Sequence, residues 1–170
     1  MERLYTPWRM KYITSTDKNK DECVFCAILR DEPEHDPDNF LVYRGQNTFV
    51  VMNLYPYNCG HLMVLPQQHV ATPADLHASV QAEMMAMASY LTGLLTNIMT
   101  PDGFNVGMNI GRAAGAGIDT HLHLHVVPRW NGDSNFMPVM GQTRVLPEEL
   151  PDTYDKISAY IKKHPPQFGG

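Results

Sequence analysis

The chain has 170 residues, of which 44% are hydrophobic and 18% charged, as in an ordinary globular domain with a core of its own. A net charge of -5 argues against a surface that coats a nucleic acid polymer. No apolar run approaches the ~20 residues of a membrane-spanning helix, and the first residues lack the apolar centre of a signal peptide. We therefore expect one cytoplasmic domain with reduced thiols, which an odd number of cysteines, three, also favours.

Five segments rich in Val, Leu, Phe and Tyr have the composition of β-strands, with turn-forming residues between them. In chain order they are residues 40–44, 48–53, 61–66, 104–110 and 119–127. A short helix or knuckle over residues 23–29 precedes them, and a polar loop over 31–39 follows it. An N-terminal arm (1–20), a core (21–130) and a C-terminal loop and helix (131–170) make up the expected single domain.

A long helix is expected between the third and fourth strands. Thr72 can cap it, Pro73 suits its first position and Asp75 suits its first turn. Apolar residues then recur at helical spacing up to about Met99, which predicts one core-facing side. They are Leu76, Val80, Met84, Met87, Leu91, Leu94, Leu95 and Ile98. A closing helix is expected between residues 147 and 163.

Three of the eight histidines alternate with leucine in the segment HLHLHVVP, residues 121–128. Alternate residues of a strand share a face and lie about 6.5–7 Å apart, so the three imidazoles should point one way. Leu122, Leu124 and Val126 should then point the other way, into a core. A surface strand that carries histidines by chance is improbable. Two readings stay open: His-x-His can bring two imidazoles to zinc, and a neutral imidazole can attack phosphorus and carry a nucleotidyl group.

A glycine-rich stretch, GRAAGAG at residues 111–117, lies just before the histidines. Backbone N–H groups of such loops can approach a phosphate closely, and Asn109 and Arg112 could add side-chain donors. Together with the histidines, this stretch favours the hypothesis that an imidazole attacks phosphorus over the hypothesis of a simple metal enzyme.

Cys23 and Cys26 form a CxxC pair, whereas Cys59 stands alone. The pair could be half of a zinc site, a redox pair or two buried cysteines. It follows no strand of a βαβ unit, which argues against a thioredoxin-like motif. A structural zinc site would need two further ligands.

These motifs resemble the histidine-triad (HIT) superfamily of nucleotide hydrolases and transferases. HLHLHVVP matches its His-φ-His-φ-His-φ-φ signature, where φ is hydrophobic. NLYPYNCGHLMVLP (53–66) is similar to its N…GH…P segment, and FNVGMN (104–109) to its phosphate-side strand. RWNGDSNFMPV (129–139) and LYTPWRMKYI (4–13) resemble a bacterial subgroup that contains diadenosine tetraphosphate phosphorylase. The resemblance implies an α+β fold with a five-stranded antiparallel sheet, a long helix and a C-terminal helix, paired into a homodimer.

The resemblance also implies catalytic roles for four histidines. His123 would be the nucleophile that takes a nucleoside monophosphate as a phosphoramidate. His125 would contact the α-phosphate and support departure of the leaving group. His121 is the first histidine of the motif, and His61 would lie beside the triad.

Other residues of the matching segments would bind the nucleotide. Asn109 would hold a phosphate oxygen or the scissile bridge, next to the phosphate-binding glycines Gly115 and Gly117. Asn53 would hydrogen-bond the ribose. Val42 and Leu54 would line the base pocket.

Some relatives, and the related galactose-1-phosphate uridylyltransferases, bind zinc through a CxxC, a distal histidine and the first histidine of the active-site motif. That resemblance implies the ligands Cys23, Cys26, His69 and His121. Such a zinc would be structural: it would fix the strand that carries His123 and would not activate water.

We therefore expect an enzyme that cleaves adenine nucleotides at the α-phosphate, with water or inorganic phosphate as the acceptor. The alternatives are an adenosine phosphoramidase-like hydrolase, a nucleotide-binding regulatory protein, and a metal hydrolase with the three histidines as zinc ligands. Arg112, Arg129 and Arg144 are candidates either for contacts with distal phosphates or for a solvated surface. Trp130 and Phe136 either cover the pocket or pack at a dimer edge.

Overall fold

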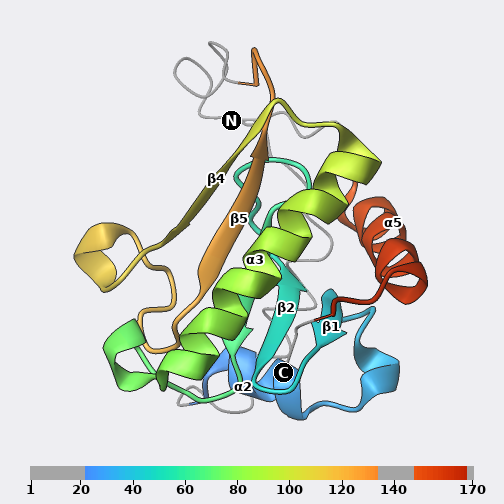
Figure 1. Cartoon of the computed structure of the whole chain (residues 1–170). Helices are drawn as coiled ribbons and strands as arrows, with labels where there is room; N and C mark the ends of the chain where they lie inside the picture. The colour runs from blue at the N-terminus through green and yellow to red at the C-terminus, as the bar shows by residue number, and fades with distance from the viewer. Residues whose placement is uncertain (1–21, 134–147, 168–170) are drawn as a thin grey trace, which may run out of the picture.

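The computed structural model describes residues 22–133 and 148–167 (Figure 1). The expected N-terminal arm, Phe136, Arg144 and residues 134–139 of the downstream motif lie outside these ranges. The helices and strands, in chain order, are α2 (Val24–Arg30), β1 (Leu41–Arg44), β2 (Thr48–Met52), β3 (Leu62–Pro66), α3 (Ala78–Met99), β4 (Gly103–Met108), β5 (Leu124–Arg129) and α5 (Leu150–Lys163). No helix in the described ranges is long and apolar enough to cross a membrane.

The five strands form one sheet in the order β1-β2-β3-β5-β4, and every neighbouring pair is antiparallel. The predicted α+β fold, with a long helix and a C-terminal helix, is thus confirmed. Central strand β3 is buried along its whole length, because both faces of the sheet are covered there. It pairs with β5 so that Met63 lies opposite His125, which brings the GH segment beside the histidine triad.

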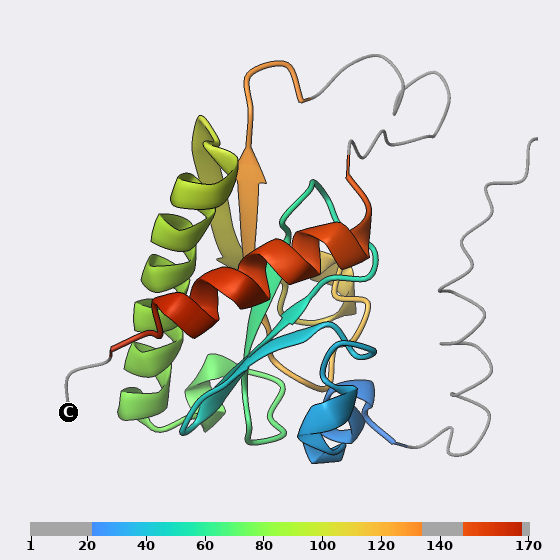
Figure 2. The same ribbon diagram turned by 90° about the vertical axis from the view of Figure 1, so that its right-hand side faces the viewer.

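Two hydrophobic layers lie on opposite faces of the sheet. Helices α3 and α5 cover one face, and α2 lies on the other side (Figure 2). The helix-side core contains Leu122, Leu124 and Val126, as the alternating pattern predicted. The opposite layer, here called the histidine-side cluster, consists of Phe25, Leu41, Phe49, Val51, Met63 and Leu65. Val42, which is predicted to line the base pocket, packs in the helix-side core, on the face of the sheet opposite the histidine-side cluster.

The predicted start of the long helix is also wrong. Thr72, Pro73 and Asp75 belong to a separate short 3-10 turn, in which the Thr72 hydroxyl donates to Asp75 instead of capping a helix. Leu76 then adopts an extended conformation that buries its side chain, and this interrupts the helical path. Helix α3 begins only at Ala78, where the side chain of His77 accepts a hydrogen bond from the Ser79 amide.

The histidine-bearing strand is shorter than predicted. β5 begins at Leu124, whereas His121 and His123 lie in the chain just before it. This chain runs beside the segment that follows β3, where the Leu122 amide donates to the Val70 carbonyl at 2.6 Å. The residues still alternate between faces, because Leu122 is in the helix-side core while His121 contacts Phe25 and Phe49.

Candidate active site and adjoining metal site

All four predicted site histidines are buried on the histidine side of the sheet. Their exposed fractions are 1% for His61, 1% for His121, 6% for His123 and 7% for His125. The reading of HLHLH as a surface strand is therefore wrong. Buried imidazoles need hydrogen-bond partners, and these partners determine which ring nitrogens carry protons.

His123 is held by the backbone in one tautomer. Its Nδ1 lies 2.8 Å from the carbonyl oxygen of His121, and a carbonyl can only accept, so Nδ1 carries the proton. The Nε2 atom of the neutral ring therefore has a free lone pair. That atom has the electronic state that a nucleophile needs.

A chain of hydrogen bonds sets the tautomers of His61 and His125. The Tyr57 amide donates to His61 Nδ1 at 3.0 Å, so the proton of neutral His61 is on Nε2. That N–H donates to His125 Nδ1 at 2.9 Å, which leaves the proton of His125 on its own Nε2. His125 Nε2 is buried and has no hydrogen-bond partner in the described part of the chain. An oxygen of a bound ligand would satisfy it.

Gly60 explains why a glycine precedes His61. Its φ of +73° lies in the left-handed region, and a Cβ there would come within 2.8 Å of the Met99 sulfur. Only glycine takes this path without strain. The GH pair therefore brings the loop that carries Tyr57 close to the start of β3.

Burial, followed by the electrostatic effect of nearby His123, lowers the pKa of His125 to about 4. His125 is therefore neutral at physiological pH and still presents an N–H group. It can donate to a phosphate oxygen without first acquiring a proton.

We expect the free energy of unfolding to decrease as pH falls from about 6.5 toward about 4. The unfolded chain takes up a proton at the ordinary histidine pKa of 6.5, whereas the folded protein keeps His125 neutral down to about 4. Between these values protons bind preferentially to the unfolded state and destabilise the fold. Urea unfolding across this range should show the slope, and His125→Gln should make it shallower. An unchanged slope in His125→Gln would contradict the assignment.

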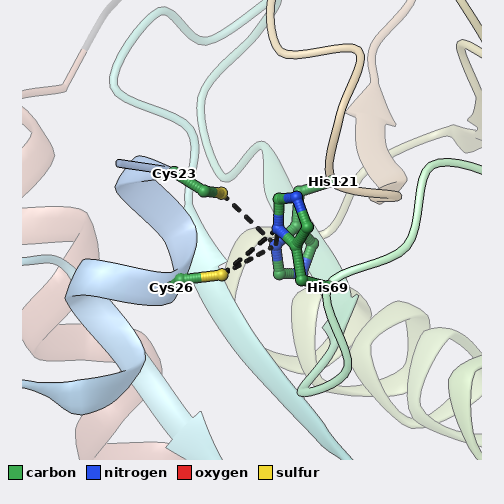
Figure 3. A group of neighbouring side chains, drawn as sticks. All are labelled: Cys23, Cys26, His69 and His121. Atoms are coloured by element: carbon green, nitrogen blue, oxygen red, sulfur yellow. Dashed lines mark hydrogen bonds between the residues drawn. The ribbon is translucent and has the colours of Figure 1, made fainter. Parts of the chain in front are cut away.

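Four predicted metal ligands converge from three separate segments of the chain (Figure 3). Cys23 immediately precedes α2 and Cys26 lies in its first turn, His69 follows β3, and His121 lies in the chain before β5. Their ligand atoms all lie within 4.8 Å of one another. The Cys26 sulfur is 3.3 Å from His69 Nδ1, and the two Nδ1 atoms are 3.3 Å apart.

These spacings fit a tetrahedral ion. Zinc bonds of about 2.0–2.1 Å to nitrogen and about 2.3 Å to sulfur place neighbouring ligand atoms roughly 3.3–3.8 Å apart. His121 is also in the ligand tautomer, because its Nε2–H donates to the Pro66 carbonyl at 2.9 Å and leaves Nδ1 free. Burial and the Cys23 thiol raise the pKa of Cys26 to about 11, so a bound cation is what would stabilise both thiolates.

The metal group includes only the first histidine of the triad. His123 and His125 make the hydrogen bonds described above and belong to no metal group among the described residues. The geometry therefore argues against a hydrolase that binds zinc with all three histidines. It also argues against the reading of Cys23 and Cys26 as merely two packed thiols.

The glycine-rich loop lies beside the end of β4. The register pairs Gly107 with His125 and Met108 with Leu124, so Asn109 follows at the level of His123. The Asn109 side chain is half-buried and makes no hydrogen bond to the residues that the structure describes. A Cβ at Gly115 or Gly117 would meet nothing within 4 Å, so space is open beside this loop.

Other predicted contacts are already engaged within the protein. Asn53 lies beside His61, with its Nδ2 3.4 Å from His61 Nδ1, and its Oδ1 accepts from the Tyr55 amide. Arg129 forms a two-point ion pair with Asp133 at 2.6 and 2.8 Å. Arg112 is exposed and pairs with Asp119 at 2.8 Å, so of the two it is the arginine more open to a ligand.

Sequence reasoning missed two aromatic residues of the site. The Tyr57 ring lies 4.7 Å from that of His61 and 5.7 Å from that of His125. The Phe25 ring lies 5.6 Å from both His121 and His123. Tyr57 lies in the segment that resembles the family motif, and Phe25 lies between the two cysteines, but neither position shows by itself which ring it contacts.

Residues 34–132 match the HIT domain family, and the chain belongs to this family. It is 40% identical over 169 residues to the AP-4-A phosphorylase of Mycobacterium tuberculosis, covering 97% of this chain and 87% of that protein. A Zn-bound histidine triad family protein from Mycobacterium smegmatis has a TM-score of 0.67 at 27% identity, covering 85% of this chain and 96% of that one. A hypothetical histidine triad nucleotide-binding protein from Sulfolobus tokodaii has a TM-score of 0.66 at 25% identity, covering 83% and 93%.

Proposed function

We propose that this protein is a nucleotidyl hydrolase or transferase that cleaves adenine nucleotides at the α-phosphate through a covalent nucleotidyl-His123. The observation that carries this proposal is the hydrogen bond from His123 Nδ1 to the His121 carbonyl, which leaves Nε2 free as a nucleophile. The buried N–H of His125, without a protein partner, supplies a donor in the same site. The relationship to AP-4-A phosphorylase supports diadenosine tetraphosphate as the substrate.

The proposed reaction has two displacements at phosphorus. His123 Nε2 attacks the α-phosphorus, a P–N bond forms, and the bond to the leaving oxygen breaks with its electron pair. His125 Nε2–H, Asn109 and the backbone of the glycine-rich loop donate to the phosphate oxygens as charge develops there. An acceptor then attacks the same phosphorus and the P–N bond breaks, which restores neutral His123.

The acceptor determines the class of enzyme. Attack by water on the intermediate releases AMP, whereas attack by inorganic phosphate releases ADP. In both cases the first displacement on diadenosine tetraphosphate releases ATP. We propose phosphate as the acceptor, on the support of the relative's name.

We further propose that Cys23, Cys26, His69 and His121 hold a structural zinc ion. The tetrahedral spacing and the His121 tautomer support this, as does the Zn-bound relative. When bound, zinc would fix the position of His121 through bonds stronger than side-chain packing. Because the His121 carbonyl accepts the His123 proton, the metal site would steady the nucleophile through the backbone.

A homodimer that extends the sheet through β4 is also part of the proposal. β4 is an edge strand, and within the described ranges it pairs only with β5. Val106, in the centre of β4, is a hydrophobic residue with 42% of its surface exposed. Monomeric proteins usually protect the edge strands of their sheets, so this exposed edge favours pairing with a second copy of the chain. Val106→Lys should therefore shift the molar mass measured by light scattering from dimer to monomer.

Product analysis tests the proposed reaction. The purified protein is incubated with diadenosine tetraphosphate, with and without inorganic phosphate. We expect ADP and ATP to appear only when phosphate is present. AMP and ATP in both samples would instead establish a hydrolase. No turnover by either route would reject this substrate and direct the assay to adenosine phosphoramidates.

A further inference from the structure

Phe25 connects the metal-binding helix with the proposed nucleophile. It lies between Cys23 and Cys26, and its side chain is only 6% exposed. Its ring centroid lies 5.6 Å from that of His121 at an interplanar angle of 75°, and 5.6 Å from that of His123 at 51°. The single apolar ring of Phe25 thus packs against the imidazoles of both His121 and His123.

The His123 ring needs such a contact in order to have one orientation. Its hydrogen bond to the His121 carbonyl holds a single atom, Nδ1. The plane of the ring could therefore still tilt around this hydrogen bond. Among the described residues, the ring of His125 also packs on it, at 4.8 Å between centroids and an interplanar angle of 84°. Phe25 also contacts His121, whereas within the described ranges His125 makes no such ring contact with Phe25. Two separate rings therefore pack on the His123 imidazole and limit the direction in which the Nε2 lone pair points.

Helix α2 is itself anchored independently of the cysteines. It has only seven residues, too few to be stable without tertiary contacts. The Arg44 guanidinium donates to the Leu29 carbonyl at 2.6 Å and to the Asp31 carbonyl at 3.0 Å, and it pairs with Asp36 at 2.6 Å. The end of β1 thus holds the C-terminal end of α2, which keeps Phe25 against the sheet.

We propose that Phe25 is a positioning residue for the reaction: its ring holds the His123 imidazole in the orientation from which Nε2 attacks phosphorus. Helix α2 would then serve catalysis through its apolar side chain as well as through its metal ligands. This inference rests on the proposed role of His123 as the nucleophile. It follows from the need to align a nucleophile closely, since a misplacement of about 1 Å can cost on the order of 100-fold in rate.

The test compares three variants with the wild type on diadenosine tetraphosphate. For Phe25→Ala we expect kcat to fall about 10- to 100-fold, while KM changes less than about threefold and the metal content is unchanged. Phe25→Leu should restore kcat to within a few-fold of the wild type, because it refills most of the space beside the ring. Phe49→Leu is the matched control: Phe49 is fully buried in the same cluster and contacts His121, at 6.2 Å. It should change kcat less than about twofold.

A second measurement needs no substrate. In 15N-labelled protein, the His123 Nδ1–H resonance should exchange slowly with water in the wild type and in Phe49→Leu. In Phe25→Ala it should exchange faster or broaden. If Phe25→Ala does not fold, Phe25→Val takes its place, because valine leaves a smaller cavity.

Three outcomes would overturn the inference. They are an unchanged kcat in Phe25→Ala, an equal loss in Phe25→Ala and Phe49→Leu, or a loss that is accounted for entirely by missing metal. If the wild type does not turn over any adenine nucleotide, the proposed function fails. The exchange rate of the His123 proton then still decides whether Phe25 positions the ring.

Discussion

Replacement of His123 by alanine should lower kcat for diadenosine tetraphosphate by at least about 1000-fold, because it removes the atom that forms the covalent bond. Overall folding should survive, since the side chain makes one hydrogen bond, to the His121 carbonyl. His164→Ala is the matched control, because His164 is exposed just after α5, on the helix side of the sheet. Its kcat should equal that of the wild type.

The covalent intermediate can be trapped directly. Rapid denaturation during turnover of adenine-labelled substrate should leave label on the wild-type protein and none on His123→Ala. A phosphoramidate is labile in acid and stable in base, which distinguishes it from an acyl phosphate or a phosphate ester. Label that persists on His123→Ala would show that another residue is the nucleophile.

Loss of the metal site should have the second large effect. Cys26→Ser removes one of the four proposed ligands and should abolish stoichiometric zinc. A loss of about 3 kcal/mol would lower the melting temperature by roughly 6–12 °C in a chain of this size. Activity should fall as well, because His121 would bind the proposed metal through Nδ1, and its carbonyl accepts the hydrogen bond from His123 Nδ1.

Cys59→Ala is the matched control for the cysteine variant. Cys59 is a buried free thiol outside the metal group, so its replacement should leave the zinc content unchanged. Zinc is measured by atomic absorption on dialysed protein, and stability by calorimetry. Full zinc content in Cys26→Ser would contradict the ligand set. Normal activity in a zinc-free Cys26→Ser would contradict the link to His123.

The fold could be predicted in most respects because its signals are local. The alternation of His121, His123 and His125 with apolar residues predicted which side chains face the helices, and the structure places them so. The errors arose where a buried residue overrode local preference. Thr72 and Pro73 have the features of a helix start, yet burial of Leu76 makes the chain extended before α3 begins.

The residue types of the site could also be predicted, but the bonds between them could not. The sequence predicted functional roles for five histidines and two cysteines: the alternation of the triad and the CxxC spacing pointed to His121, His123, His125, Cys23 and Cys26, whereas the resemblance to the family added His61 and His69. Only the tertiary structure decided that His61 donates to His125, because that contact depends on the register between β3 and β5. It also decided that Phe25 packs on His123, because helix α2 is placed by Arg44 and by the sheet face it covers. Local sequence determines which face of an element a side chain occupies, whereas its partner is set by the packing of distant segments, such as Cys23 and His121, which are 98 residues apart.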